Sequence, residues 1–556
     1  MSSTRPSRRA VLTGLAAAGA SGLFLRSGPA SAATESVAIT GTSTSRTVIP
    51  SDRQGFNRRW FAGGLQTVYV PTRTEDVAAC LEAAIAAHGR HVKVVSGRHC
   101  YEDFSYNATT RAIIDMSGIN QAGFDAEHDA YFVDAGCDNW SAYRTLLNAF
   151  GRTLPDGSCA SVGAGGHISG GGYGLLSREH GLSVDWVTAV DIVTWDDITG
   201  TARLRHVSDI STDPDERDLF WAVRGAGGGN FGIITRFYFA QPPAAPAHAS
   251  IWNVSWNWDD VSASGFRTLL SEYADWVEQM PGRQFSLLKL NHVAAGQITM
   301  ILQIASEPGS TQESHLARAG AAVTAAQRRF ARVARVPGAT RSVRPGQQTV
   351  QHLTFLEALW TLNGSGPNQF GKYKSSYLRV AMPDEQADAL HHWLHVTPAG
   401  VSTSDMAQSL VQIDSYGGAI NTHTSTSTPV PQRSSLLKLQ FQTYWNNSSP
   451  IGRGDSGRYG AQQQAHLNWI RGMYSDTYAR YGGVPDPDRD PGGIVDGCYY
   501  NYPDSDLGTH ADGRIDEALS LYFQGNFRTN PRNLVAVKRR WDPTNVFHHA
   551  QSIPTE

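Results

Sequence analysis

The chain has 556 residues, of which 40% are hydrophobic and 17% are charged, and its formal net charge is −3. A chain of this length exceeds one ordinary hydrophobic core, so two or more domains are expected. The near-neutral charge argues against a nucleic-acid partner and against a membrane-surface role that depends on bulk charge. Small molecules are therefore the expected partners.

Residues 1–32 have the pattern of a signal peptide. A twin arginine at Arg8 and Arg9 precedes an apolar stretch from Val11 to Leu25, and Ala30-Ser31-Ala32 offers a cleavage site. The apolar stretch is too short to span a bilayer, so no membrane insertion is expected. Twin-arginine signals direct export of folded proteins, which predicts that the mature protein is secreted.

The first folded region is predicted to be a mixed α+β domain over residues 50–243. Leu65–Pro71 is predicted as a strand, a capping box at Thr72 and Glu75 begins a helix that ends before Gly89, and His91–Val95 is a buried strand leading to a loop that carries His99. Further strands are expected at 112–116, 130–135 and 187–193, with a helix at 140–150. The domain ends at a proline-rich linker, residues 242–246.

After the linker the pattern changes to that of an antiparallel sheet covered by helices. Strands are predicted at 252–258, 286–290, 298–302 and 436–444, and helices at 264–279 and 313–333. This arrangement predicts a second, substrate-facing domain over residues 247–490. Residues 491–556 are expected to return to the first domain.

The most informative stretch is the glycine-dense run at residues 157–182, GSCASVGAGGHISGGGYGLLSREHGL. Its glycines can take positive φ and present bare N–H groups to an anionic cofactor. The spacing matches neither a P-loop nor a Rossmann fingerprint. Cys159, one of five cysteines without disulfide or metal-ligand spacing, is embedded in the run.

This run resembles the flavin-binding core of the vanillyl-alcohol oxidase superfamily, in the branch with a berberine-bridge-type C-terminus. Ser96-Gly97-Arg98-His99 lies 60 positions before Cys159, as in members of that branch that attach FAD twice. The resemblance implies a PCMH-type FAD-binding domain, with His99 linked to the flavin 8α-methyl and Cys159 to carbon 6. Arg98 departs from the family, in which glycine is more usual before the histidine.

Two further motifs extend the resemblance over nearly the whole mature chain. Leu219–Gly232 resembles the second glycine cluster of the family, which closes around the adenosine and pyrophosphate, and Tyr500–Asp504 and Trp541–Phe547 resemble the berberine-bridge ending. The cofactor contacts that the resemblance implies, beside His99 and Cys159, are Gly97, Gly163, Gly165, Gly166, Gly170, Gly171, Gly172, Gly228, Gly229, Asn230 and Tyr500.

An oxidase of this kind needs a base that takes the hydroxyl proton while hydride leaves for the flavin. In this branch the base resembles the tyrosine of the Asn-Tyr-x-Asp segment, which here is Tyr502; Tyr499 and Tyr500 are rivals. The alternative for Tyr502 is an aromatic ring that packs under the site with its hydroxyl hydrogen-bonded.

Asp414 and Tyr416 are a second candidate pair, which either assists the base or serves a second oxidation; their Asp-x-Tyr-Gly-Gly setting is also ordinary turn chemistry. Gln440 stands where plant berberine-bridge enzymes carry a glutamate, and an amide cannot act as a base. This departure favours plain alcohol dehydrogenation over ring closure. His167 and His180 have no carboxylates at ligand spacing, so no metal is expected.

The sequence therefore predicts a secreted FAD-dependent oxidase that acts on a CH–OH group of a sugar, oligosaccharide or glycosylated natural product, with oxygen as acceptor and hydrogen peroxide as product. Bacterial members with this ending tailor antibiotics, which suggests a role in antibiotic biosynthesis. Two alternatives stay open: oxidative bond formation or dehydrogenation with another acceptor, and a resistance flavoprotein that sequesters a toxic compound.

Overall fold

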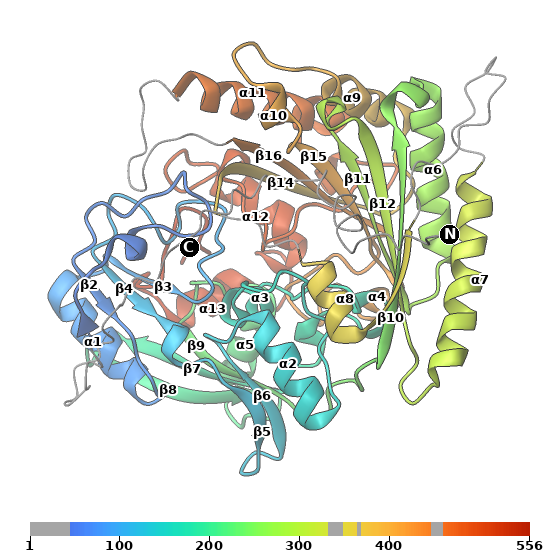
Figure 1. Cartoon of the computed structure of the whole chain (residues 1–556). Coiled ribbons are helices and arrows are strands. Elements are labelled where there is room, and N and C mark those ends of the chain that lie inside the picture. The colour runs from blue at the N-terminus through green and yellow to red at the C-terminus, as the bar shows by residue number, and fades with distance from the viewer. Residues whose placement is uncertain (1–44, 332–348, 364–367, 446–459) are drawn as a thin grey trace, which may run out of the picture. The chain divides into compact units, whose positions relative to one another are not determined.

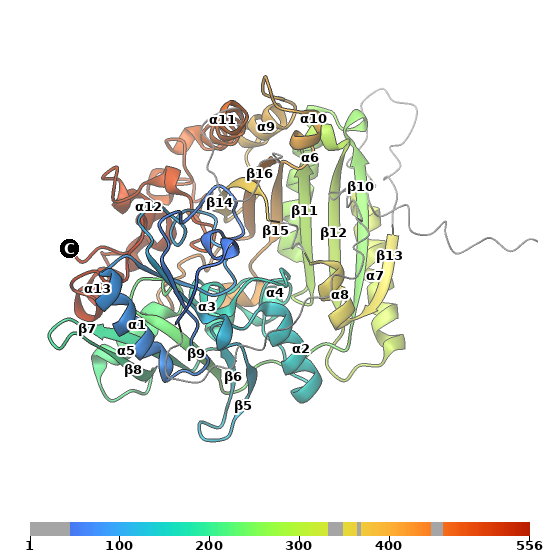
Figure 2. The same cartoon turned by 60° about the vertical axis from the view of Figure 1, so that its left-hand side comes forward.

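The computed structural model describes residues 45–331, 349–363, 368–445 and 460–556, which contain three β-sheets (Figures 1 and 2). The predicted signal peptide lies outside these residues. None of the helices within them is both long and apolar enough to cross a membrane.

The first sheet has the strand order β1-β2-β4-β3, and its three longer strands run parallel. The strands are β1 (Ser45–Arg46), β2 (Thr67–Tyr69), β3 (Val92–Val95) and β4 (Ala112–Asp115), and helix α1 (Asp76–His88) connects β2 to β3. The buried side chains of α1, among them Val77 and Leu81, pack with Ile114 of β4 in one apolar cluster. The predicted strand–helix–strand order is confirmed.

The second sheet is antiparallel, with the strand order β5-β6-β9-β7-β8. The strands are β5 (Ala122–Asp125), β6 (Ala130–Asp134), β7 (Ala189–Asp196), β8 (Thr201–Ser208) and β9 (Ile233–Phe239). Between β6 and β7 the chain forms α2 (Asn139–Phe150), α3 (Ala164–Ser169) and α4 (Ser177–His180), and α5 (Pro214–Val223) precedes β9. The glycine run, residues 157–182, contains α3 and α4 and lies between α2 and β7 along the chain.

The third sheet has seven antiparallel strands in the order β13-β10-β12-β11-β15-β16-β14. They are β10 (His248–Asn257), β11 (Gln284–Asn291), β12 (Gln297–Ala305), β13 (Thr349–Thr354), β14 (Phe370–Leu378), β15 (Leu410–Ser415) and β16 (Leu437–Trp445). Helices α6 (Ala263–Gln279), α7 (Gln312–Phe330), α9 (Asp384–Leu394), α10 (Thr403–Met406) and α11 (Gly460–Thr477) lie on the face turned away from α2 and α4 (Figure 2). The predicted antiparallel sheet with covering helices is confirmed.

The two faces of this large sheet differ in polarity because side chains alternate along each strand. On the helix side, Leu288, Met300 and Ile413 are fully buried. On the opposite side, Lys289, Thr299 and Gln412 are half-buried. The polar face therefore points toward the first two sheets and not into the helical layer.

The C-terminal segment lies against the FAD-side elements. Helix α13 (Leu534–Trp541) packs against α5, and Lys538 donates from Nζ to the carbonyl oxygen of Asn230 at 2.7 Å. Helix α12 (Ile515–Phe523) contributes Tyr522 and Phe523, whose rings pack around Tyr500. The α13–α5 packing and the Lys538–Asn230 hydrogen bond join the C-terminal segment to residues of the first domain.

Candidate functional site

Two glycines bring the His99 loop and the Cys159 loop into direct backbone contact. A Cβ on Gly97 would lie 2.2 Å from the amide nitrogen of Gly163, and one on Gly163 would lie 2.0 Å from Ser96 Oγ. No side chain fits at either position, since real Cβ contacts are not this short. The contact places the two predicted attachment residues on adjoining loops, where His99 Nε2 lies 2.9 Å from Ser161 Oγ.

His99 is a half-buried, neutral imidazole. Its ring stacks on Phe56 with centroids 4.6 Å apart, and burial lowers the pKa of His99 to about 4. The Ser161 contact engages Nε2, so the other ring nitrogen, Nδ1, is the one outside that hydrogen bond. A neutral imidazole has one unprotonated ring nitrogen, and the lone pair on that nitrogen is what a covalent link requires.

Arg98 takes the left-handed conformation, with φ of 61°. Its guanidinium contacts Asp115 and lies 3.5 Å from Asp52 Oδ1, and its carbonyl oxygen accepts from the amide of Phe56 at 2.8 Å. A backbone of this shape explains why glycine suits the position before the histidine. In this chain the ion pairs hold an arginine there instead.

Cys159 is half-exposed, and none of the five cysteines forms a disulfide. The Asn139 side chain donates to its carbonyl oxygen at 3.2 Å, which fixes the loop. Burial is the main cause that raises the pKa of Tyr101, Tyr444 and Tyr502, and the Cys159 thiol makes a smaller contribution in the same direction. These interactions place the thiol beside a cluster of tyrosines from three separate segments.

Tyr502 lies at the centre of a buried charged group. Lys438 donates from Nζ to Tyr502 Oη at 3.2 Å and to Asp414 Oδ2 at 2.9 Å, and the ammonium also stands 4.3 Å from the centre of the Tyr502 ring. The Lys438 side chain is 0% exposed. Burial, followed by Asp414, raises the pKa of Tyr502 well above its ordinary value. The structure thus brings the two predicted residues Tyr502 and Asp414 together through a lysine.

Lys438 and Tyr101 are site residues that the sequence reasoning missed. Gln440 Nε2 donates to Tyr101 Oη at 3.0 Å, and the Tyr101 ring stacks on Tyr373 with centroids 3.7 Å apart. A signal for Lys438 was present, because polar side chains recur at every second position of β16 from Lys438 to Tyr444 inside an otherwise apolar strand. For Tyr101 the one signal in the sequence was its position two residues after His99.

The other tyrosines of the C-terminal motif have their hydroxyls engaged. Asn501 donates to Tyr499 Oη at 3.0 Å, and Asn230 donates to Tyr500 Oη at 2.7 Å. The side-chain oxygen Oδ1 of Asn230 accepts from the amide of Ile553 at 2.9 Å. Asn230 and Tyr500 therefore join the second glycine cluster to the C-terminal segment through their polar groups.

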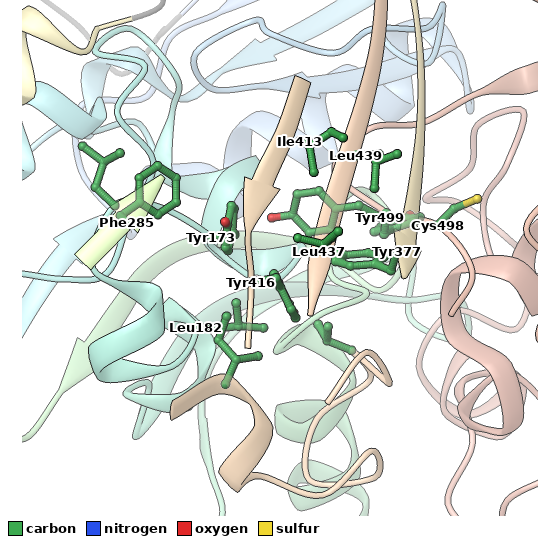
Figure 3. Close-up of a cluster of buried hydrophobic side chains, with 14 of the residues drawn as sticks. Tyr173, Leu182, Phe285, Tyr377, Ile413, Tyr416, Leu437, Leu439, Cys498 and Tyr499 are labelled. Atoms are coloured by element: carbon green, nitrogen blue, oxygen red, sulfur yellow. The ribbon is translucent and has the colours of Figure 1, made fainter. Parts of the chain in front are cut away.

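Tyr416 lies in the core, apart from its predicted companion Asp414. Its side chain is 0% exposed and packs among Tyr173, Tyr377 and neighbouring aliphatic residues (Figure 3), and its hydroxyl donates to the carbonyl oxygen of Gln432 at 3.1 Å. The strand alternation turns Asp414 to the polar face, whereas the chain leaves the strand before Tyr416. We therefore assign no proton transfer to Tyr416.

The remaining predicted glycines fall into two kinds. A Cβ on Gly165 would lie 2.9 Å from the Ala135 carbonyl oxygen and one on Gly170 would lie 2.0 Å from Asn501 Oδ1, while Gly171, Gly172 and Gly229 have positive φ. Gly166 differs, because a Cβ there would meet no atom within 4 Å, and at Gly228 the first atom met is Tyr500 Cε1 at 3.8 Å. Open glycine backbone beside a half-buried imidazole and a half-buried thiol suits contact with a large flat cofactor.

Within the described residues no three His, Cys, Asp or Glu side chains gather as potential metal ligands. His167 instead accepts at Nε2 from the amide of Gly157 at 3.0 Å, inside the glycine run.

Comparison with known proteins assigns the family. Residues 65–199 match the FAD binding domain model, and residues 498–554 match the model described as berberine and berberine like. Hexose oxidase from Chondrus crispus is 36% identical over 534 residues, which cover 91% of this chain and 93% of that protein. Aclacinomycin-N/aclacinomycin-A oxidase from Streptomyces galilaeus is 33% identical, covering 90% of this chain and 87% of the relative. The crystal structure of a glycopeptide hexose oxidase complexed with teicoplanin superposes with a TM-score of 0.75 at 30% identity, covering 90% of this chain and 95% of that one.

The chain therefore belongs to the FAD-linked oxidases of the vanillyl-alcohol oxidase superfamily that carry a berberine-bridge-type C-terminus. It is an FAD-dependent oxidoreductase, with a PCMH-type FAD-binding domain and an antiparallel-sheet second domain. The family resemblance of the glycine run and of the C-terminal motif is confirmed.

Proposed function

We propose that this protein is an exported oxidase that removes two electrons and two protons from a CH–OH group of a sugar or glycoside, with FAD held at His99 and Cys159 and oxygen reduced to hydrogen peroxide. The observation that carries the proposal is the Asp414–Lys438–Tyr502 group beside the Cys159 loop. It supplies a proton acceptor next to the predicted flavin attachment. The printed names of the relatives, hexose oxidase and a glycopeptide hexose oxidase among them, support a sugar hydroxyl as the group oxidised.

FAD, when bound, supplies the acceptor for the hydride and later passes the two electrons to oxygen. The chain's own part is to receive the hydroxyl proton at Tyr502 Oη. Because burial and Asp414 raise the pKa of Tyr502, the phenol is protonated at neutral pH, so it must release that proton before Oη can accept the one from the substrate hydroxyl. The Lys438 ammonium, 3.2 Å from Oη, opposes this shift, since a cation stabilises the phenolate.

Tyr101 and Gln440 would orient the substrate. The Gln440–Tyr101 hydrogen bond leaves the phenol of Tyr101 able to donate in turn to a substrate hydroxyl, and the stacked Tyr373 ring fixes its direction. An amide at Gln440, where a ring-closing base would stand, supports simple dehydrogenation over oxidative ring closure. A tyrosine activated by a lysine also supports turnover over sequestration of a compound without reaction.

His99 and Cys159 are the proposed covalent anchors. Their support is the Gly97–Gly163 contact, the neutral half-buried imidazole and the half-exposed thiol. Export through the twin-arginine route rests on the sequence of residues 1–32 alone. That route suits a protein that acquires its cofactor while folding in the cytoplasm.

The first experiment is acid precipitation of the purified mature protein, with absorbance and intact mass of the pellet, for the wild type and for His99→Ala, Cys159→Ala and the double variant. We expect flavin to stay with the pellet in the wild type and in each single variant, and to leave it in the double variant. A peroxide-coupled screen of hexoses and glycosides follows. Flavin in the supernatant of the wild type would overturn the attachment, and a yellow protein that oxidises no sugar or glycoside would overturn the substrate class.

A further inference from the structure

Two described parts of the chain between β13 and β14, residues 355–363 and residues 368–369, lie against the FAD-side elements. These two strands form opposite edges of the sheet, and the connecting chain carries helix α8 (Phe355–Thr361). Asn363 Oδ1 accepts from the amide of Ala160 at 3.1 Å, and Asn368 Nδ2 donates to the carbonyl oxygen of Gly55 at 3.2 Å. Since Ala160 follows Cys159 directly, the end of α8 borders the candidate active site.

This segment carries an exposed tryptophan beside the Cys159 loop. Trp360 is 59% exposed, and its ring lies 5.0 Å from that of Trp140 at the start of α2, with α8 beside α2 in both views (Figures 1 and 2). The Trp140 amide donates to the carbonyl oxygen of Ala160 at 3.1 Å. Ala160 thus makes backbone hydrogen bonds to the Trp140 main chain and to the Asn363 side chain, which lies three residues after Trp360. An indole left in water at such a position is a ready partner for a ring of the substrate.

A strip of polar side chains continues outward from the Tyr502 site on the facing sheet. Gln440 pairs across with Gln412, Gln412 with Lys289, and Lys289 with Thr299, so the four residues share one face of neighbouring strands. Three strand spacings amount to about 14 Å, which is longer than one pyranose ring. Lys289, Gln412 and Thr299 are half-buried and offer donors and acceptors of the kind that sugar hydroxyls bind.

The strip and the tryptophan lie on the same side of the sheet. Lys438 and Asp414, which belong to this face, reach Tyr502, and Gln303 of the same face donates to the carbonyl oxygen of Leu175 at 3.3 Å. The polar face is therefore turned toward the FAD-side elements, where α8 is also attached through Asn363. Lys289 has no carboxylate ion pair among the described residues, because Asp414 pairs with Lys438.

We propose that the binding site extends beyond the ring that is oxidised, into a second subsite where Trp360, supported by Trp140, stacks on a further pyranose ring whose hydroxyls bind the strip Gln412, Lys289 and Thr299. This inference rests on the proposed sugar oxidation. It makes the preferred substrate a di- or oligosaccharide, or a glycoside with at least two sugar rings, and not a free hexose.

The test compares oxidation of a hexose with oxidation of its disaccharide and trisaccharide, by the holoenzyme and by Trp360→Ala, Trp360→Phe and the control Phe124→Ala. Phe124 is a 43% exposed aromatic residue on the β5–β6 hairpin, away from the site. We expect Trp360→Ala to raise the KM for the disaccharide about tenfold with kcat and the hexose parameters unchanged, because truncating an anchoring aromatic residue typically loses at least that much affinity. Trp360→Phe should recover most of the loss, and Phe124→Ala should change nothing.

The outcomes separate this inference from the proposed function. If the wild type oxidises sugars but Trp360→Ala changes hexose and disaccharide kinetics by the same factor, or changes neither, the second subsite is wrong and the sugar oxidase stands. If no saccharide of any length reduces the flavin, the proposed function itself fails. A wild type that prefers the free hexose over its disaccharide would also overturn the subsite.

Discussion

Lys438 decides how readily the tyrosine beside it ionises. Its ammonium lies between Asp414 and Tyr502 and is removed from water, so its charge acts on both neighbours through a medium of low polarity. Without this cation Tyr502 would ionise less readily, because burial and the carboxylate both raise the pKa of Tyr502.

Replacing this lysine should move the pH dependence of oxidation. Lys438→Met removes the cation and leaves Asp414 unpaired, and both changes destabilise the Tyr502 phenolate. We expect kcat to fall at least about 100-fold at neutral pH, the loss typical of an impaired general base, and the rising limb of the pH profile to move to higher pH. The measurement is the rate of flavin reduction between pH 6 and 10.

Lys438→Arg is the matched control, because it keeps the charge and should keep the rising limb of the pH profile near its wild-type position. If the rising limb of the methionine variant lies at the same pH as that of the wild type, Lys438 has no part in the mechanism.

Arg98 tests what the unusual backbone before His99 contributes. Arg98→Gly and Arg98→Val both lose the ion pairs with Asp115 and Asp52, but only glycine takes a φ of 61° without cost. We therefore expect both variants to melt at lower temperature than the wild type. The glycine variant should keep most of its acid-stable flavin, whereas the valine variant should lose a large part of it.

The comparison of the two Arg98 variants separates charge from backbone. If acid-precipitated pellets of both variants hold the same fraction of flavin, the left-handed conformation has no part in presenting His99. The free energy of unfolding serves as the internal check, because it should fall in both variants through loss of the ion pairs and fall further in the valine variant through backbone strain.

At the scale of elements, strand β14 supports the site from beneath. Lys374 Nζ lies 2.7 Å from Asp504 and 2.9 Å from Asp506, and the neighbouring Lys372 contacts Glu102 and Asp504. Burial alone would lower the pKa of Lys372, but Asp504 and Glu102 outweigh it and raise that pKa. Glu102 is the residue after Tyr101, and Asp504 lies two positions after Tyr502. This network therefore fixes both tyrosine segments against β14.

Breaking the network should cost more than removing a lysine elsewhere in the sheet. Lys374→Met removes one partner each from Asp504 and Asp506, which keep Lys372 and Arg471, so the free energy of unfolding should fall by about 1.5–3 kcal/mol. Lys289→Met, on β11 and without a carboxylate ion pair, should change it by less than about 1 kcal/mol. Denaturant unfolding of both variants gives the comparison, and similar losses in the two would show that the β14 network is not a main source of stability.

The elements that could be predicted were those with a local pattern. Periodicity gave α1, α2, α6 and the strands β3, β11 and β12 within a few residues, because their apolar faces recur at fixed spacing. Strands β8 and β14 were missed: Thr201–Ser208 is largely polar, and Phe370–Leu378 alternates charged and aromatic residues that are buried only through long-range ion pairs. Such strands take their burial from partners far along the chain, which no local window contains.

The same distinction holds for the site. His99, Cys159 and Tyr502 could be predicted from motifs, since glycine spacing and the C-terminal segment mark them. Lys438 was marked only by the polar alternation of β16 and Trp360 by no pattern, because their positions depend on which strand or helix lies opposite: Tyr502 is 64 positions from Lys438, and Ala160 is 203 positions from Asn363. Tyr416 shows the converse, a residue with a suggestive motif that the fold places in the core.

At the scale of the whole molecule, buried histidines should make the protein sensitive to mild acid. Burial lowers the pKa of His466 and of His180 to about 4, below the ordinary value of 6.5, and it lowers that of His292 and His549 as well. Between pH 4 and 6.5 the unfolded chain therefore binds more protons than the folded one. The free energy of unfolding should fall as the pH drops through this range and stay level above it with respect to these groups.

His466 allows this to be tested at one position. The His466 ring is fully buried and stacks on Trp445, and its Nδ1 lies 2.7 Å from Thr443 Oγ1. The protonated ring would therefore be a cation without access to water, which burial disfavours. Lowering the pKa of His466 from 6.5 to about 4 corresponds to a loss of about 3 kcal/mol in the free energy of unfolding by pH 4. We expect His466→Gln to lower the Tm at pH 7.5 but to narrow the gap between the Tm values at pH 7.5 and pH 4.5, whereas His91→Gln, at an exposed position, should leave the gap unchanged. Of the two histidines, only His466 is buried in the folded protein. If all three proteins show the same gap between their Tm values, the acid sensitivity comes from other groups.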